Sequence, residues 1–320
     1  MDEQHLDIVI PDTLRGKRLD QALAVLLPQH SRARLQGWIR EGQVTVDGHV
    51  PSQRDRIKGG ERVALRVSWP EAQHDAAEAI PLDIVHEDAE LLLLNKPPGL
   101  VVHPGAGNPA HTLLNALLHH DPALARVPRC GIIQRLDKDT SGIMVIARTP
   151  VAHTWLTGQM RRRLIKREYD AIVSGELTAG GTVDAPLGRH AVQRTRMAVS
   201  EGGRVAVTHY RILKRFRACT WLRVQLETGR THQIRVHMSH IHHPVLGDRL
   251  YGGVTRLPRG LTERLRHAIR DFGRQALHAT ALTLVPPGET RARTWKVPLP
   301  ADMRGLLELI EAEQDGHAKR

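Results

Sequence analysis

The sequence has few cysteines, no long apolar run and a shortage of acidic residues. Its 320 residues include two cysteines, Cys130 and Cys219, which stand apart and form no CxxC pair. This pattern argues against a structural zinc site and is typical of a reducing compartment. No stretch approaches the roughly 20 apolar residues that a transmembrane helix needs. Because residues 1–5 are acidic and polar, we also expect no signal peptide, and we predict a cytoplasmic protein without membrane contact.

The charge of the chain is strongly positive. Lys and Arg number 46 against 34 Asp and Glu, a net charge of +12 with a pI near 10.4. A charge of this size attracts a polyanion, most simply nucleic acid, with a membrane surface as the competing partner. Half of the net charge lies in residues 15–66, which carry eleven Lys or Arg and five Asp or Glu. The length allows two domains.

Residues 1–67 predict a small basic α/β module with its core in residues 15–67. A first helix presents Leu19, Leu23, Leu26 and Leu27 on one face and ends at Pro28. Ser31 is a good N-cap for a second helix, which Gly42 ends. Strands on either side of an Asp-Gly turn follow. The second helix presents three arginines that favour phosphate contact, the alternative being a solvated face: Arg32, Arg34 and Arg40.

Residues 68–80 are polar and Ala-rich, which predicts a flexible linker. Residues 81–310 form the predicted large domain, and residues 311–320 are a charged tail that we expect to fray. Within the large domain, alternation over residues 197–210 predicts a hairpin around Gly202 and Gly203. Arg194 and Arg196 lead into it. Such a basic arm either grips RNA or stays solvated, and the residues themselves do not decide between the two.

A cluster of charges precedes an apolar run within residues 131–147. The five apolar residues after Gly142 predict a buried strand. Just before them lie Asp137 and its charged neighbours Arg135 and Lys138, at positions that burial does not explain. A carboxylate held beside cations stays ionised, and it can act as a general base or a nucleophile. The alternative is a charged turn that joins two strands.

Three other site patterns are incomplete. Residues 137–141 resemble the Asp-x-Asp pattern of haloacid-dehalogenase-type phosphatases, but no apolar strand leads directly into Asp137 and no second paired-Asp motif follows, since Asp248 stands alone. Gly105 and Gly107 lack the Gly-Lys-Ser/Thr ending of a phosphate loop. The histidines within residues 232–243 have no thiolate or paired carboxylate beside them, so we expect no metal site.

Residues 168–173 alternate, which places Tyr169, Ala171 and Val173 on one face of a strand. From this pattern alone, Tyr169 is predicted to be a packed core residue.

Three ordered motifs together resemble the RluA-type RNA pseudouridine synthases. They are residues 135–142 (RLDKDTSG), 167–169 (REY) and 228–237 (TGRTHQIRVH). The resemblance implies an α+β fold, with a mixed, mostly antiparallel sheet flanked by helices around a central cleft. It implies that Asp137 is essential for catalysis, that Tyr169 stacks on the target base, that Arg235 pairs with Asp137, and that Arg135 holds the space left by the flipped nucleotide. The N-terminal module resembles the RNA-binding fold of ribosomal protein S-four.

The implied reaction is the isomerisation of uridine to pseudouridine in 23S rRNA or a precursor of the large ribosomal subunit, at the loop of helix 69. No redox change occurs and no group is gained, so the reaction requires no cofactor. We expect a monomer. Asp137 attacks the sugar, attacks the ring or removes a sugar proton, and the sequence leaves these routes open. The family usually has His where this chain has Gln134, a difference that we expect to be structural. The alternative function is a non-catalytic rRNA-binding or assembly factor.

Overall fold

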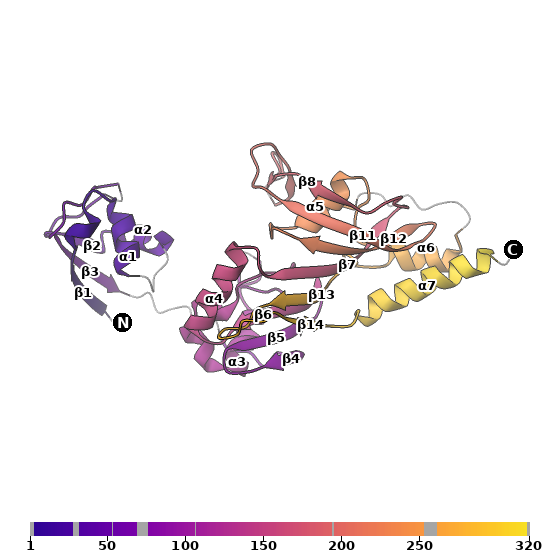
Figure 1. Ribbon diagram of the computed structural model, residues 1–320, viewed down its shortest axis with the longest axis horizontal. Helices are drawn as coiled ribbons and strands as arrows, with labels where there is room; N and C mark the ends of the chain where they lie inside the picture. Colours follow the sequence, from indigo (N-terminus) through magenta and orange to yellow (C-terminus); the bar gives the residue numbers. More distant parts are fainter. Residues whose placement is uncertain are drawn as a thin grey trace. The chain divides into compact units, whose positions relative to one another are not determined.

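The computed structural model describes residues 3–27, 32–52, 54–68, 76–105, 107–193, 195–252 and 261–318 (Figure 1). The chain divides into two compact units, residues 1–74 and residues 75–320. Each unit has its own hydrophobic core, as two independently folded domains do.

The small unit packs two helices on an antiparallel sheet with the strand order β1-β3-β2. Leu19 and Leu23 of the first helix are fully buried against Leu35 and Ile39 of the second, so the predicted helices are confirmed. The buried carboxylate of Asp20 accepts a hydrogen bond from Gln36 Nε2 at 2.6 Å and joins the helices. The elements are β1 (Glu3–Val9), α1 (Leu19–Leu26), α2 (Arg32–Arg40), β2 (Val44–Val46) and β3 (Arg62–Ser68).

Strand β1 was not predicted. It pairs with the whole of β3, from Glu3 opposite Ser68 to Val9 opposite Arg62. Leu6 and Ile8 alternate with polar residues along it, and this period-2 pattern is the signal that could have revealed the strand.

The large unit is built on one sheet with the order β4-β5-β6-β13-β7-β12-β11-β8, and β14 pairs with β13. Among the strand pairs of the described residues, β6 and β13 alone run parallel. The predicted mixed, mostly antiparallel sheet is therefore confirmed. A separate small sheet pairs β9 with β10. The strands are β4 (Ile84–Glu87), β5 (Leu91–Lys96), β6 (Ser141–Ala147), β7 (Lys166–Ser174), β8 (Gly181–Asp184), β9 (Leu187–Arg189), β10 (Met197–Val199), β11 (Val207–Arg215), β12 (Cys219–Leu226), β13 (Leu277–Leu284) and β14 (Arg293–Lys296).

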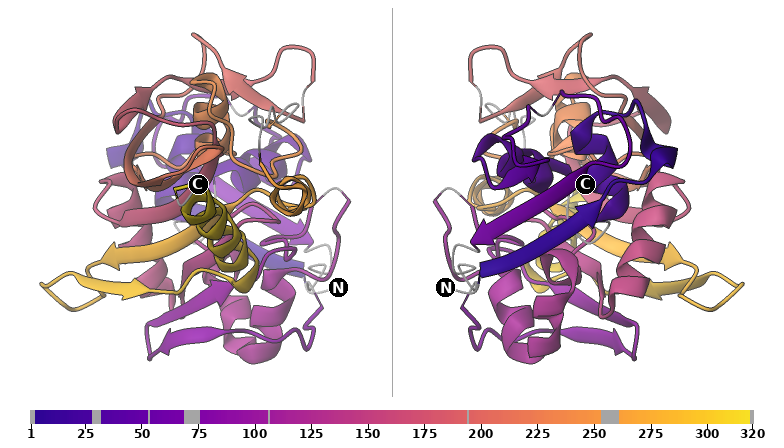
Figure 2. Two further views of the ribbon diagram at one scale, coloured as in Figure 1. Left: turned by 90° about the vertical axis from the view of Figure 1, so that its right-hand side faces the viewer. Right: turned by 90° about the vertical axis from the view of Figure 1, so that its left-hand side faces the viewer.

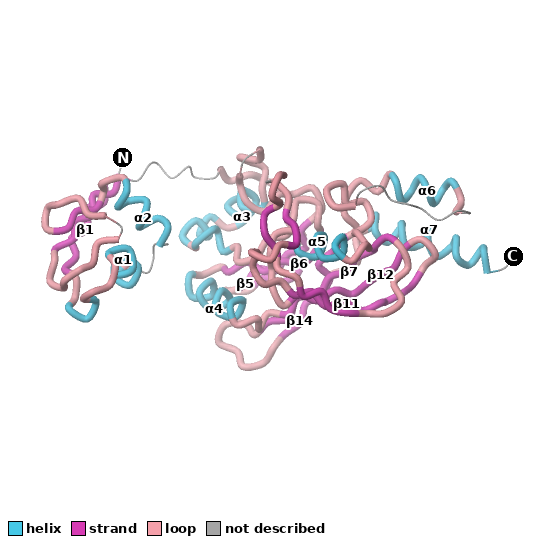
Figure 3. Tube along the Cα trace, turned by 90° about the horizontal axis from the view of Figure 1, so that it is seen from above, coloured by secondary structure: helices cyan, strands magenta, loops and turns pink. Residues whose placement is uncertain are grey.

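Most helices of the large unit lie toward its two ends, and α5 lies between them (Figure 3). Helices α3 and α4 lie near β5 and β6, whereas α6 and α7 lie at the other end, and Figure 2 shows β13 and β14 as a long hairpin. None of the helices formed by the described residues is long and apolar enough to span a membrane. The helices are α3 (Leu113–His120), α4 (Pro150–Arg161), α5 (Gln233–His240), α6 (Glu263–Arg270) and α7 (Ala301–Ala318).

Strand β6 is the centre of the large core. All seven of its residues are buried, and it lies between β5 and β13. Burial on both faces of a strand favours a continuous apolar run rather than alternation, which explains the sequence after Gly142. The loop that leads into β6 is thereby fixed at one end by the most buried strand of the unit.

The predicted hairpin over residues 197–210 is wrong. Strand β10 pairs with β9, whereas β11 pairs with β8 and β12, so the two segments belong to different sheets. Alternation along each segment identified a strand, but it carried no information about the partner.

Parts of the predicted linker and of the predicted C-terminal tail are described, whereas residues 69–75 of the linker lie outside the described residues. In the predicted linker, the Ala76 carbonyl accepts from Asn115 Nδ2 at 2.8 Å, and Glu78 N–H donates to the Asn115 carbonyl at 3.0 Å. At the C-terminus, helix α7 continues to Ala318 where a frayed tail was predicted. Its Glu311 pairs with Lys214 of β11 at 2.9 Å.

A substitution at Gly142 tests how closely the backbones of β6 and β13 approach each other. Its φ is +122°, and a Cβ at this position would lie 2.7 Å from the Ala279 carbonyl carbon and closer still to the Ala279 nitrogen and oxygen. We expect Gly142→Ala to lower the free energy of unfolding by about 3 kcal/mol, because the backbones must separate. The matched control is Gly158→Ala in α4, where nothing lies within 4 Å. It should stabilise the protein by about 0.5–1 kcal/mol. Equal denaturation midpoints for the two variants would contradict the close approach.

Candidate active site

The loop before β6 is held by the backbone carbonyl of Lys138. This oxygen accepts hydrogen bonds from Gly99 N–H and from Lys96 Nζ, both at 2.9 Å. The Thr140 N–H donates to the Asp137 carbonyl at 3.1 Å and closes a turn around Lys138. The Lys96 side chain and the Gly99 backbone therefore fix the backbone of the loop that carries Asp137.

Lys96 is fully buried, which is rare for lysine. Its Nζ also donates to the carbonyls of Pro97 at 2.7 Å and Leu100 at 2.9 Å, so three acceptors match the three protons of an ammonium. Burial lowers the pKa of Lys96 to about 7, although the charges of Asp139 and Asp137 raise it. Lys96 thus joins the 97–100 turn to the Asp137 loop. The sequence analysis did not identify this role.

Asp137 is bound by Arg235 of α5. The Arg235 Nη1 donates to Asp137 Oδ2 at 2.9 Å, as the family resemblance implied. On its other edge the guanidinium donates from Nε to Asp248 Oδ2 at 2.6 Å and from Nη2 to Asp248 Oδ1 at 2.9 Å. This bidentate contact fixes the plane of the guanidinium and hence the direction of the N–H that reaches Asp137.

Asp248 is a functional candidate that the sequence analysis missed. Its side chain is fully buried, and Oδ1 also accepts from the N–H groups of Leu250 and Tyr251 at 2.9 and 3.0 Å. Burial raises the pKa of Asp248, but the hydrogen bonds and charge of Arg235 outweigh it and hold that pKa below its usual value. Burial lowers the pKa of Arg235, yet its bonds to Asp248 and the charge of Asp137 raise it above the ordinary value. The group therefore carries one cation between two carboxylates.

His232 lies beside Asp137 in a left-handed backbone conformation, with φ of +57°. Its Nδ1 contacts Tyr251 Oη at 2.8 Å, and its Nε2 lies 3.9 Å from Asp137 Oδ1. Burial lowers the pKa of His232, and the Asp137 charge only partly restores it. The ring is therefore mainly neutral at pH 7. The Met197 N–H donates to Tyr251 Oη, which fixes this side chain in turn.

A cavity of about 480 Å³ opens over Asp137. This size falls within the range of roughly 300–1,000 Å³ of small-ligand pockets. Tyr169 of β7 lines it together with Leu226 and Leu277, and only 7% of Tyr169 is exposed. Tyr169 is thus both a core residue, as its alternation predicted, and part of the cavity wall. Burial raises the pKa of its hydroxyl, so it stays neutral.

The cavity wall also contains cationic and polar residues. Arg135 is exposed there and donates from Nη2 to Thr231 Oγ1 at 3.3 Å. Gln134, which stands where the family usually has His, is 9% exposed and lines the same cavity. Burial, together with the charges of Arg129 and Arg135, lowers the pKa of His103 to about 4. An apolar and aromatic pocket with one carboxylate and surrounding cations suits a planar base attached to a phosphate backbone.

The predicted RNA-binding arginines have different surroundings. Arg196 is half-buried, with Nη1 donating to Gln193 at 2.9 Å, Nη2 donating to the Leu250 carbonyl and the guanidinium lying 5.3 Å from the Tyr251 ring centroid. Arg40 is exposed at the end of α2, and its Nε donates to the Gln36 carbonyl. Arg194 and the side chains of Arg32 and Arg34 lie outside the described residues.

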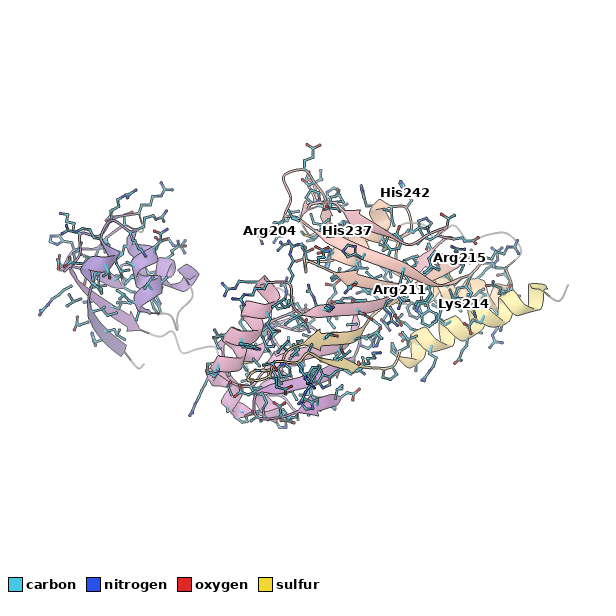
Figure 4. All side chains as sticks on the ribbon, viewed as in Figure 1. Arg204, Arg211, Lys214, Arg215, His237 and His242 are labelled. Atoms are coloured by element: carbon cyan, nitrogen blue, oxygen red, sulfur yellow. The ribbon has the colours of Figure 1, made fainter. Side chains whose placement is uncertain are left out.

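Among the described residues, no three His, Cys, Asp or Glu side chains gather as metal ligands. His237, labelled in Figure 4, instead contacts Thr208 Oγ1 at 2.8 Å and the Ala185 carbonyl at 2.9 Å.

The chain is similar in sequence to known proteins. A family model described as RNA pseudouridylate synthase matches residues 90–240, and a model of the S4 domain matches residues 17–63, which confirms the predicted N-terminal module. A protein of Pseudomonas aeruginosa named ribosomal large subunit pseudouridine synthase D is 53% identical over 306 residues, 96% of each chain. Its Escherichia coli counterpart of the same name is 50% identical over 313 residues, 98% of this chain and 96% of that protein.

A solved structure titled human RNA pseudouridylate synthase domain containing 4 superimposes with a TM-score of 0.56 at 26% identity. The match covers 72% of this chain and 93% of the human one.

The Lys96 contacts can be tested by stability. We expect Lys96→Met to lower the free energy of unfolding by about 3 kcal/mol, because three carbonyl oxygens each lose a hydrogen bond from the ammonium. Lys166→Met, at an exposed position on β7, should change it by less than about 0.5 kcal/mol. Chemical denaturation of both variants measures the difference. If Lys96→Met melts like the wild type, the three hydrogen bonds do not hold the loop.

Proposed function

The chain belongs to the RNA pseudouridylate synthase family, and we propose that it converts uridines of 23S rRNA, in the loop of helix 69, to pseudouridine with Asp137 as the catalytic carboxylate. The observation that carries this proposal is the contact of Asp137 with Arg235 at a cavity that Tyr169 lines. The names of the relatives, which refer to the large ribosomal subunit, support the choice of RNA.

We assign a separate role to each residue of the site. The target base leaves its stack at a cost of a few kcal/mol, which stacking on Tyr169 offsets, while Arg135 occupies the vacated space. Arg235 binds Asp137 Oδ2 and orients the carboxylate. Oδ1 accepts no hydrogen bond from the described part of the chain, and His232 is its neighbour at 3.9 Å. Oδ1 is therefore the oxygen available to the nucleotide.

Three routes are compatible with this placement. Asp137 attacks C1′ of the sugar, adds to the uracil ring, or removes a sugar proton and starts an elimination. In every route the product is an isomer of the substrate, so the proposed reaction uses no cofactor. The proposal also includes a monomer that works in the cytoplasm.

The small unit is the proposed second RNA contact. Its residues 15–66 carry a net charge of +6, and Arg40 and Arg54 line a shallow pocket beside the exposed Val50. A tethered second contact raises the local concentration of RNA at the active site without changing the chemistry. Arg32, Arg34, Arg194 and Arg196 remain predicted RNA contacts.

The function is tested by the release of tritium from 23S rRNA that carries uridine labelled at carbon 5, with the modified positions mapped by sequencing. We expect release by the wild type and a loss of at least about 10³-fold for Asp137→Asn, because the amide is a poor nucleophile and base. Asp139→Asn, in the same loop, should stay within tenfold of the wild type. RNA binding without any tritium release by the wild type would favour the non-catalytic alternative.

Deletion of residues 1–74 tests the role of the small unit. The truncated protein should bind RNA more weakly, because fewer counterions are released. The slope of log affinity against log salt should become shallower by roughly 0.7 for each phosphate of single-stranded RNA that the small unit neutralises. Single-turnover rates at saturating RNA should change much less. A full-length double variant, Arg40→Gln with Arg54→Gln, should fall between the two proteins. Coincident salt slopes for full-length and truncated protein would mean that the small unit is no RNA anchor.

A further inference from the structure

Arg167 is a buried arginine whose role the proposed mechanism leaves open. It lies on β7, two residues before Tyr169, so both side chains point to the same face of the strand. Arg167 is 9% exposed, and it lines the cavity that also contains Asp137. The charges of Arg167 and Asp137 both act on the Tyr169 hydroxyl, which places the three groups in one electrostatic environment.

The guanidinium of Arg167 has no carboxylate partner among the described residues. Its neighbours Glu168 and Asp170 face the opposite side of β7, where Arg223 pairs with them at 3.1 and 2.6 Å. Within the described chain, the buried Nε of Arg167 also lacks a hydrogen-bond acceptor. Arg235, by contrast, is bound by two carboxylates. Arg167 therefore contributes a positive charge to the cavity that the protein does not neutralise.

Gly229 makes room for this guanidinium. A Cβ at Gly229 would lie 2.5 Å from Arg167 Nη1. Gly229 belongs to the turn between β12 and α5, the same turn that leads to His232 and Arg235. The motif of residues 228–237 thus has two roles: its Gly229 leaves space for the Arg167 guanidinium at the cavity, and it contains Arg235.

Burying an unpaired cation costs several kcal/mol, and removing such a charge from a protein core commonly stabilises it. A site of this kind is best explained by an anionic group that the cavity binds only during function. The reaction produces such a group on the uracil ring in each of the three routes.

The electron balance shows where this charge forms. In sugar attack, an Asp137 oxygen bonds C1′, and the electrons of the C1′–N1 bond leave with N1. In elimination, Asp137 removes the C2′ proton, and the electrons of the C1′–N1 bond again leave with N1. Uracil then departs as an anion shared by N1, O2 and O4. In ring attack, the oxygen bonds C6 and the C5–C6 π pair moves to O4; the C1′–N1 bond then breaks and its electron pair stays on N1. Carbon 5 later bonds C1′, Asp137 departs or returns the C2′ proton, carbon 5 loses its proton and N1 gains one.

We propose that the Arg167 guanidinium binds the O2 or O4 oxygen of the target uracil and stabilises the negative charge that develops on the ring. Arg167 is then a catalytic residue whichever route Asp137 takes, a role that rests on the proposed function. A preorganised donor for developing charge typically contributes about 10²–10³ in rate. The planar fork of arginine suits a carbonyl oxygen in the plane of the base.

The test compares uridine with 5-fluorouridine at the target position, because fluorine withdraws electrons and makes uracil a better leaving anion. We expect Arg167→Met to slow single-turnover isomerisation of uridine RNA by about 100-fold but to slow glycosidic rearrangement of 5-fluorouridine RNA by only about tenfold. The RNA affinity of the variant should stay within threefold. The matched control is Arg211→Met on the exposed part of β11, labelled in Figure 4, which should change neither rate.

Gly229→Ala provides a second variant that leaves the arginine in the chain. The added methyl displaces the guanidinium, so the same difference between the two substrates is expected, with a smaller loss. Equal losses on the two substrates, or no loss in either variant, would overturn the assignment of Arg167. Failure of the wild type to form pseudouridine would instead overturn the proposed function, so the two failures are distinguishable.

Discussion

The placement of one arginine between two carboxylates organises the active site. Asp248 holds two nitrogens of Arg235, and the third reaches Asp137. Because Asp248 is buried and also bound by two backbone N–H groups, it cannot rotate away without leaving donors unpaired. The flexible arginine side chain is thereby converted into a fixed donor. The orientation of the proposed catalytic carboxylate thus depends on a residue that has no contact with it.

The loop that carries Asp137 is also fixed by a small number of contacts. Lys96 Nζ donates to the carbonyl of Lys138, and the start of β6 lies in backbone contact with β13 at Gly142. Buried polar groups of this kind rigidify a site when every donor and acceptor is satisfied. The cavity above the loop differs, because its wall carries cations such as Arg135 and Arg167 that face space rather than acidic partners. The loop that holds Asp137 is therefore rigid, whereas the cavity where we propose that the nucleotide binds has cations without acidic partners.

Positive charge is distributed differently in the two units. In the small unit it is concentrated in residues 15–66, which carry a net charge of +6, whereas acidic residues on either side of this segment reduce the net charge of residues 1–74 to 11 − 10 = +1. A local concentration of cations suits contact with a phosphate backbone. In the large unit, Arg135 and Arg167 line the cavity, whereas Arg223 on the opposite face of β7 is paired with Glu168 and Asp170. Contact with the phosphate backbone and stabilisation of charge within the cavity are thus proposed for different parts of the chain.

The local sequence pattern was sufficient to predict features that depend on neighbouring residues. These features are the helices of the small unit, the buried strand after Gly142, and the motifs that contain Asp137, Tyr169 and Arg235. It was insufficient wherever partners are distant. Alternation over residues 197–210 identified strands but joined them wrongly, because the side-chain period of a strand does not depend on what it pairs with. Asp248 and Lys96 carried no local signal, since a lone acid or lysine acquires its role only when folding buries it against specific partners. Arg167 stood within a recognised motif, yet its unpaired charge became visible only once β7 had turned its acidic neighbours to the opposite face.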